Sequence, residues 1–163
     1  MAVTSYAIAL GSNRRSRHGS PAATVRAAAA ALGVERLSRI RATAALGPAG
    51  RGFANAAAIL ASGLEPPELL AELKAVERGF GRRVGRRWGP RVLDLDIVLW
   101  SGGAWEGRGL VVPHPEFRRR RFVLEPMAEI APHWRDPLTG ATVRQLLVRL
   151  ARSAPVDRGG ARS

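Results

Sequence analysis

Short apolar runs, each bounded by turn residues, recur along the chain and predict β-strands. Five segments follow this pattern: Tyr6–Leu10, Leu37–Thr43, Phe53–Leu60, Leu93–Trp100 and Leu110–Val112. The clearest helix is predicted over Pro66–Phe80, because apolar residues recur there at helical spacing, at Leu69, Leu70, Leu73, Val76 and Phe80. The pattern therefore alternates between strand-like runs and a longer helical segment.

Other segments complete an α+β pattern. Helices are predicted over Pro21–Leu32, Val123–Ile130 and Val143–Leu150, with a helical turn over Phe117–Arg121. Ser20 and Pro21 are typical of a helix start, and Gly33 of a C-cap. Residues 11–13 predict a turn, and residues 46–52 and 81–91 predict loops. We expect one α+β domain over residues 1–151 and a disordered tail over residues 152–163, which lack periodicity.

Composition limits the class of protein. A chain of 163 residues with 46% hydrophobic residues suits one globular domain. It has no cysteine, which excludes disulfides and thiolate metal sites and fits a reducing compartment. The first residues lack the pattern of a signal peptide, and no apolar run approaches the roughly 20 residues of a membrane span. We therefore expect a soluble, cytoplasmic protein.

The net charge of +13 indicates an anionic partner such as nucleic acid, phosphate or a lipid surface. A second interpretation is equally open. Lys74 is the only lysine among 26 basic residues, and arginine, alanine and glycine are abundant together. A general compositional bias explains much of such a surplus, so only clustered arginines carry functional weight.

Asp94 and Asp96 stand out within the apolar strand pattern. Residues i and i+2 of a strand share a face and lie roughly 6.5–7 Å apart, so both carboxylates point away from Leu93, Leu95 and Ile97. Two such carboxylates repel each other unless a cation lies nearby. Ion pairs with neighbouring guanidiniums are one interpretation. A magnesium site for phosphoryl transfer is the other, since Mg²⁺ takes carboxylate, water and phosphate oxygens.

Arginines gather on the loop that precedes these aspartates. Six of them occupy 14 positions: Arg78, Arg82, Arg83, Arg86, Arg87 and Arg91. A solvated basic loop would have this composition, and so would a phosphate clamp, because guanidinium groups bind phosphate bidentately. Trp88 in the same loop could pack as a lid or stack on a base.

Two further segments carry candidate binding residues. Phe53 and Asn55 either complete the core and cap a strand, or bind a flat heterocycle through stacking and paired hydrogen bonds. His114 lies between two prolines and precedes four consecutive arginines, Arg118 to Arg121. A phosphate contact is as plausible there as a structural histidine.

Together these motifs resemble the 6-hydroxymethyl-7,8-dihydropterin pyrophosphokinase family of folate synthesis. The segments that carry the resemblance are Ala9–Asn13, Phe53–Ala57, Val76–Glu77, Gly81–Arg82, Arg87–Arg91, Leu93–Ile97, Val112–Pro115, Arg120–Leu124 and Glu129–Pro132. The resemblance implies a ferredoxin-like fold with an antiparallel-rich central sheet between helices, in three α-β-α layers. It implies transfer of pyrophosphate from ATP to the pterin hydroxymethyl oxygen, with AMP as the other product.

The resemblance also implies roles for single residues. Asp94 and Asp96 would bind two Mg²⁺ ions and would be catalytic together with Arg82 and Arg91. The ATP-binding residues would be Glu77, Arg82, Arg87, Trp88, Arg91, Ile97, His114 and Arg120. The pterin slot would comprise Thr43, Ala44, Leu46, Phe53, Asn55, Asp94 and Phe122.

The chain departs from the family pattern at Thr43, where Ala44 and Ala45 follow in place of the usual proline, and the loops after Leu46 and Gly81 are short. We expect small-molecule substrates, no nucleic-acid or membrane partner and a monomer. A basic RNA- or DNA-binding domain is the alternative that the charge favours, and it predicts salt-sensitive binding. A catalytically inactive relative is a third interpretation, against which the retained acids, arginines and asparagine argue.

Overall fold

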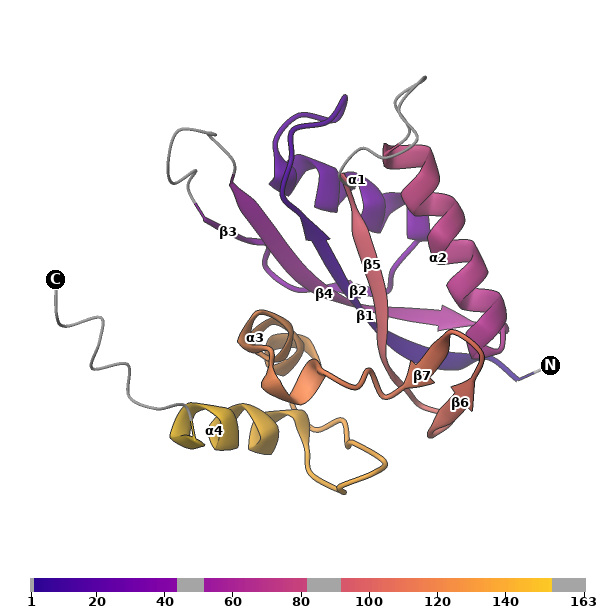
Figure 1. Cartoon of the computed structure of the whole chain (residues 1–163), viewed down its shortest axis with the longest axis vertical. Helices are drawn as coiled ribbons and strands as arrows, with labels where there is room; N and C mark the ends of the chain where they lie inside the picture. The colour runs from indigo at the N-terminus through magenta and orange to yellow at the C-terminus, as the bar shows by residue number, and fades with distance from the viewer. Residues whose placement is uncertain (1, 44–51, 82–91, 154–163) are drawn as a thin grey trace, which may run out of the picture.

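The computed structural model describes residues 2–43, 52–81 and 92–153 (Figure 1). Within them the elements follow in the order β1 (Thr4–Ser12), α1 (Pro21–Leu32), β2 (Arg36–Leu37), β3 (Arg41–Thr43), β4 (Phe53–Ser62), α2 (Pro66–Gly81), β5 (Asp94–Trp100), β6 (Trp105–Gly107), β7 (Leu110–Val112), the 3₁₀ turn η1 (Phe117–Arg119), α3 (Arg121–Ile130) and α4 (Val143–Ser153). No described helix is long and apolar enough to cross a membrane.

The main sheet is antiparallel, with β1 between β4 and β5. Strands β2 and β3 both pair with β4 on its other edge, and β6 and β7 form a separate two-stranded sheet. If β2 and β3 are counted as one interrupted strand, the order from β1 to β5 is β-α-β-β-α-β, which is the ferredoxin-like arrangement. This confirms the fold class predicted from the sequence.

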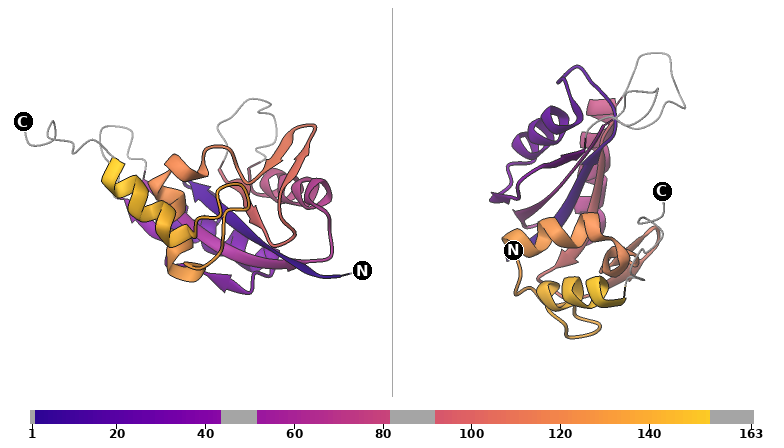
Figure 2. Two further views of the ribbon diagram at one scale, coloured as in Figure 1. Left: turned by 90° about the horizontal axis from the view of Figure 1, so that it is seen from below. Right: turned by 90° about the vertical axis from the view of Figure 1, so that its left-hand side faces the viewer.

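The sheet lies between two helical layers (Figures 1 and 2). On one face, Ile8 and Leu95 belong to a buried apolar cluster completed by residues of α1 and α2. On the other face, Ala7 and Leu99 belong to a second cluster completed by residues of η1, α3 and α4. Because side chains alternate across a strand, each central strand contributes to both clusters, and the predicted three layers are confirmed.

Several boundaries differ from the sequence-based prediction. The predicted strand over residues 37–43 is two short strands, because Ser38 turns inward between them: its N–H donates to Ala57 O (2.8 Å) and its hydroxyl accepts from Ala57 N–H (2.9 Å). The predicted turn at residues 11–13 begins later, since β1 continues to Ser12. Strand β6 was not predicted, and α4 continues to Ser153, so the first two residues of the predicted tail are helical.

Helix α1 matches its prediction at both ends. The Ser20 side chain accepts a hydrogen bond from Ala23 N–H, Pro21 opens the helix, and Gly33 ends it with φ of 67°. These caps satisfy backbone groups that a helix leaves unpaired at its ends, and glycine adopts positive φ without a Cβ clash. Local sequence signals therefore mark both ends of this helix.

Candidate active site

A row of four residues crosses the main sheet at one end. Gly11 of β1 pairs with Asn55 of β4 on one side and with Asp94 of β5 on the other, and Arg41 of β3 pairs with Asn55. Directly paired residues of antiparallel strands project from the same face. The row therefore points toward the layer of α3, the layer against which Ala9, two residues from Gly11, packs.

The glycine in this row leaves room for its neighbours. A Cβ placed on Gly11 would lie 3.2 Å from Asn55 Oδ1. The next row on the same face also has a small centre, because Ala9 pairs with Ala57 and with Asp96. Small residues on β1 thus form a flat floor between the amide of Asn55 and the two carboxylates.

A cavity of about 470 Å³ opens above this floor. Its walls come from β1, β4, β5 and the start of α3, and its lining residues are Ala9, Leu10, Gly11, Asn55, Ala56, Asp94, Asp96, Arg120, Phe122 and Val123. Phe122 is half exposed, and the Arg120 guanidinium carbon lies 5.8 Å from the centre of its ring. This cavity, which we call the acceptor cavity, combines an aromatic face, an amide and carboxylates. Such a combination suits a flat polar heterocycle.

A second cavity, of about 400 Å³, lies on the other side of Asp96, between α2 and the β6–β7 hairpin. Its lining residues are Leu70, Lys74, Asp96, Ile97, Gly107, Gly109, Leu110, Val111, His114 and Pro115. Asp96 is the residue that lines both described cavities. A carboxylate at that junction can act on groups bound in either cavity.

The orientation predicted for the acidic pair is confirmed. Leu93, Leu95 and Ile97 are at most 2% exposed, whereas Asp94 is exposed and Asp96 half-buried. The described residues contain no cluster of three or more carboxylate or imidazole side chains able to hold a metal ion by themselves. Two carboxylates fit Mg²⁺ only if water and phosphate oxygens complete its shell, which is its usual mode of binding at phosphate sites.

Glu77 has a role that its sequence position did not predict. Its carboxylate is 8% exposed, accepts a hydrogen bond from Leu95 N–H (2.7 Å) and pairs with Lys74 Nζ (3.2 Å). Leu95 separates the two aspartates, so Glu77 fixes α2 to the acidic strand. Predicted as an ATP ligand, it has both oxygens bonded within the protein.

His114 is oriented by its own loop. Its N–H donates to Val98 O (3.0 Å), and its Nδ1 accepts from Glu116 N–H (3.1 Å). The neutral ring therefore carries its proton on Nε2 and can donate it to an anion. Burial lowers the pKa of His114; Asp96 opposes this and Arg120 adds to it, and the pKa lies below its usual value.

The four consecutive arginines have different partners. Arg118 forms two hydrogen bonds to the fully buried Asp136, at 2.5 and 2.9 Å, while Arg119 pairs with Glu116 and Arg121 with Glu125. Of these four arginines, Arg120 lines a cavity, namely the acceptor cavity that Asn55 and Phe122 also line. Arg120 therefore lines a different cavity from Ile97 and His114, which were predicted to bind the same nucleotide, although its charge is close enough to lower the pKa of His114.

Other predicted site residues lie at the edges of this arrangement or beyond it. Phe53 opens β4 opposite Thr43, its side chain is 52% exposed, and it is not among the lining residues of the acceptor cavity. Six predicted residues lie outside the described residues: Ala44, Leu46, Arg82, Arg87, Trp88 and Arg91. The sequence analysis placed neither Leu70, Lys74 nor the β6–β7 segment in the site. For the β6–β7 segment, a tryptophan at position 105 and several nearby glycines were the available signal.

Comparison with known proteins bears on this site. The family model described as "7,8-dihydro-6-hydroxymethylpterin-pyrophosphokinase (HPPK)" matches residues 7–132. The chain is 44% identical over 118 residues to the 2-amino-4-hydroxy-6-hydroxymethyldihydropteridine pyrophosphokinase of Synechocystis sp., covering 72% of this chain and 60% of that relative. It is 38% identical over 146 residues to the protein of the same name from Bacillus subtilis, covering 88% of this chain and 87% of that relative.

The fold of this chain also resembles that of solved structures. A crystal structure of wild-type Plasmodium falciparum HPPK-DHPS superposes with a TM-score of 0.70 over 91% of this chain and 41% of that chain, at 11% sequence identity. At that identity the likeness concerns the fold alone. The chain spans less than two thirds of the Synechocystis relative and less than half of the Plasmodium chain.

Proposed function

The chain belongs to the 7,8-dihydro-6-hydroxymethylpterin-pyrophosphokinase family, and we propose that it transfers the terminal diphosphate of ATP to the hydroxymethyl group of 6-hydroxymethyl-7,8-dihydropterin. In this reaction the hydroxyl oxygen bonds to the β-phosphorus. The bond from that phosphorus to the α–β bridging oxygen breaks, AMP leaves, and the hydroxyl proton is released.

One observation carries the proposal: Asp96 lines both cavities, and Asp94 lines the acceptor cavity beside it. In our proposal the pterin occupies the acceptor cavity, with Asn55 pairing to its ring and Phe122 lying against its face. Asp94 then lies near the hydroxymethyl group. The nucleotide occupies the second cavity, with its phosphates toward Asp96, so the two reacting groups meet at the acidic pair.

The residues described around Asp96 suit phosphate chemistry. His114 can donate from Nε2 to a phosphate oxygen, and Arg120 brings a permanent positive charge to the same region. We propose that Asp94 and Asp96 hold two Mg²⁺ ions together with the ATP phosphates. Bound there, Mg²⁺ would supply Lewis-acid stabilisation of the negative charge that develops on the phosphates during transfer.

The second-cavity residues offer a mixed surface for a nucleoside. Leu70, Leu110 and Val111 are apolar, while Lys74 is a polar neighbour at the same edge. Mostly apolar walls with a few polar groups are typical of small-molecule sites. The Arg82, Arg87, Trp88 and Arg91 contacts that the family resemblance implies stay part of this proposal.

Isothermal titration tests the assignment of the two cavities. We expect a non-hydrolysable ATP analogue to bind only when Mg²⁺ is present, and Asp96→Asn to weaken that binding at least tenfold. Asn55→Ala should weaken binding of the pterin alcohol and leave the nucleotide unaffected. Equal binding of the analogue with and without Mg²⁺, or an Asn55→Ala variant that loses the nucleotide instead, would contradict the assignment.

A further inference from the structure

We propose that Arg41 is a positioning residue that sets the separation between the two sides of the acceptor cavity. It connects the strand layer next to Asn55 to the helix that presents Phe122. This inference rests on the proposed function, because it concerns how the chain holds its pterin. Arg41 itself is not among the residues that line the cavity.

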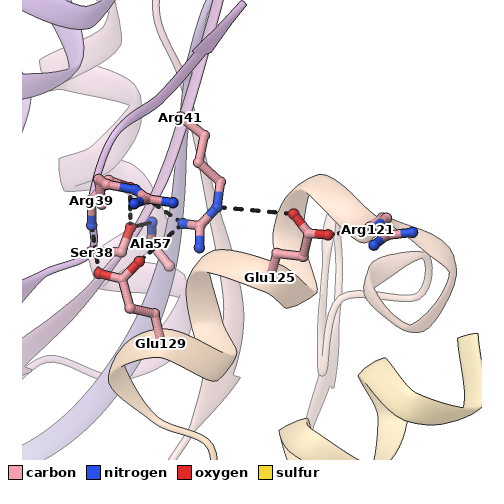
Figure 3. A network of polar contacts seen from close by, with 7 residues as sticks. All are labelled: Ser38, Arg39, Arg41, Ala57, Arg121, Glu125 and Glu129. Atoms are coloured by element: carbon pink, nitrogen blue, oxygen red, sulfur yellow. Dashed lines mark hydrogen bonds and ion pairs between the residues drawn. The ribbon is translucent and has the colours of Figure 1, made fainter. Parts of the chain in front are cut away.

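The connection consists of two ion pairs between β3 and α3 (Figure 3). Arg41 Nη1 lies 3.1 Å from Glu129 Oε1, and Arg41 Nε lies 3.9 Å from Glu125 Oε2. All three side chains are about one-third exposed, at 29%, 33% and 37% for Arg41, Glu125 and Glu129. The guanidinium therefore bridges two successive turns of the helix rather than a single carboxylate.

Further hydrogen bonds fix the two ends of this bridge. The second oxygen of Glu129 accepts a hydrogen bond from Arg39 N–H at 2.7 Å, so the same carboxylate binds both a side chain and the backbone of the β2–β3 segment. Ser38 joins that segment to β4 by its bonds to Ala57. Glu125 is also paired with Arg121. Arg41 thus connects two anchored parts of the structure, as the labelled side chains in Figure 3 show.

The strand register places one end of the bridge beside the cavity. Arg41 is the direct partner of Asn55, which in turn pairs with Gly11 of the cavity floor. On the helix, residues three or four apart share a face, so Glu125 and Phe122 lie on neighbouring positions of α3. The bridge therefore joins the amide side of the cavity to its aromatic side over a short path.

The start of α3 has little other polar support among the described residues. Its N-cap residue, Arg120, makes no side-chain capping hydrogen bond. Phe122 is half exposed, so packing restrains it less than it restrains Leu124, which is fully buried. We infer that the ion pairs of Arg41, to Glu125 in the second turn and to Glu129 in the last turn, restrict how far α3 moves from β4, and with it the aromatic face offered to the pterin.

Arg36 provides a matched control. Its Nη1 donates to Ile130 O at 2.9 Å and so links the same strand segment to the end of the same helix. Arg36 pairs with Ile59, however, four residues along β4 from Asn55 and roughly 13 Å away at about 3.3 Å per residue. Loss of Arg36 removes an arginine contact between the same elements but leaves the cavity end of the interface intact.

The test compares steady-state kinetics of Arg41→Ala, Arg41→Gln and Arg36→Ala in the full chain. We expect both Arg41 variants to raise the KM for the pterin alcohol about fivefold, near the upper limit for a partly exposed ion pair. The KM for ATP and kcat should change less than about twofold.

Arg36→Ala should leave both KM values unchanged, and Arg41→Lys, which retains the charge, should recover part of the effect. The Gln variant keeps part of the aliphatic stem and a polar end without the charge, and it is measured whether or not the Ala variant folds.

The outcomes separate this inference from the proposed function. If the wild-type chain releases AMP and the Arg41 variants keep its pterin KM, the positioning role is refuted and the proposed function stands. If Arg36→Ala and Arg41→Ala raise the pterin KM equally, the positioning role is likewise refuted and the proposed function stands, because the effect is then a general loosening of α3. A folded wild-type chain that neither releases AMP nor binds the pterin alcohol refutes the proposed function and the inference together.

Discussion

Asn55 and Asp94 lie on opposite sides of Gly11 in a single row of the main sheet, with Gly11 as the direct partner of each. This row explains how an amide and a carboxylate that are 39 positions apart in the sequence come to face one cavity. Only the central strand separates them, and its residue there has no side chain. The acceptor cavity is a consequence of strand register.

Gly11→Ala tests the need for an empty position in this row. The new Cβ would lie 3.2 Å from Asn55 Oδ1, close enough that the amide must shift by a few tenths of an ångström. We expect the KM for the pterin alcohol to rise several-fold, while the free energy of unfolding changes by less than about 1 kcal/mol. Steady-state kinetics and urea unfolding measure the two effects.

Gly63→Ala is the control for this substitution, since a Cβ there meets nothing within 4 Å. It should change neither KM. A Gly11→Ala variant with wild-type kinetics would mean that Asn55 does not bind the substrate from its present position.

Arg118 and Asp136 form the ion pair that anchors η1, the turn between His114 and Arg120, and the Arg118 side chain is 25% exposed. Asp136 is fully buried and also accepts hydrogen bonds from Thr139 Oγ1 (2.8 Å) and Leu138 N–H (3.0 Å). Arg118→Ala would leave this carboxylate without its cation, and we expect a loss of about 3 kcal/mol in the free energy of unfolding. Urea denaturation measures it.

The exposed Arg119–Glu116 pair is the matched comparison. Arg119→Ala should cost less than about 1 kcal/mol, because surface ion pairs contribute little. Similar losses in the two variants would indicate that the Arg118–Asp136 pair is not the anchor of this turn.

Asp136 also predicts how stability depends on pH. Burial would raise its pKa, but hydrogen bonds from Arg118, Thr139 and Leu138 outweigh burial and hold the pKa below its usual value of 3.8. Because the folded-state pKa is the lower one, the stabilisation is complete above about pH 4 and is lost as the pH falls through the folded-state pKa. Unfolding curves of wild type and Arg118→Ala should therefore converge on acidification below pH 4. Curves that stay parallel would contradict this account.

The pKa of His114 should respond to the nucleotide. In the free chain, burial lowers this pKa below 6.5, and we expect titration by NMR to report a neutral ring at pH 7. A phosphate near Nε2 favours the charged ring, so a bound ATP analogue should raise the pKa. An unchanged or further lowered pKa in the complex would place the phosphates elsewhere.

Local sequence signals predicted the elements that depend on neighbouring residues. Helix α1 begins and ends at the predicted residues because its caps lie next to it, and the Asp94–Asp96 orientation follows from strand periodicity alone. The sequence-based prediction missed the Ser38 turn between β2 and β3, since Ser38 turns toward Ala57, 19 residues away. It missed β6 as well, because that strand is short and largely exposed.

The site residues likewise divide into those that the sequence could identify and those whose partners depend on the folded structure. Asp94, Asp96, Asn55 and Phe122 were identified from residue chemistry and family resemblance, and they share one cavity. The division of the four arginines was beyond sequence reasoning, because it depends on which acids lie nearby in space: Glu116, Glu125 and Asp136 bind three of them. Glu77 was predicted to bind ATP from its place in a motif, whereas its bonds to Leu95 N–H and Lys74 Nζ depend on the packing of α2 against the acidic strand.

Product analysis with the pterin alcohol, ATP and Mg²⁺ tests the proposed diphosphate transfer most directly. We expect AMP and a pterin that has gained a diphosphate, in equal amounts, with the activity lost in Asp96→Ala while that variant stays folded. Release of ADP with a singly phosphorylated pterin, or full activity in Asp96→Ala, would contradict it.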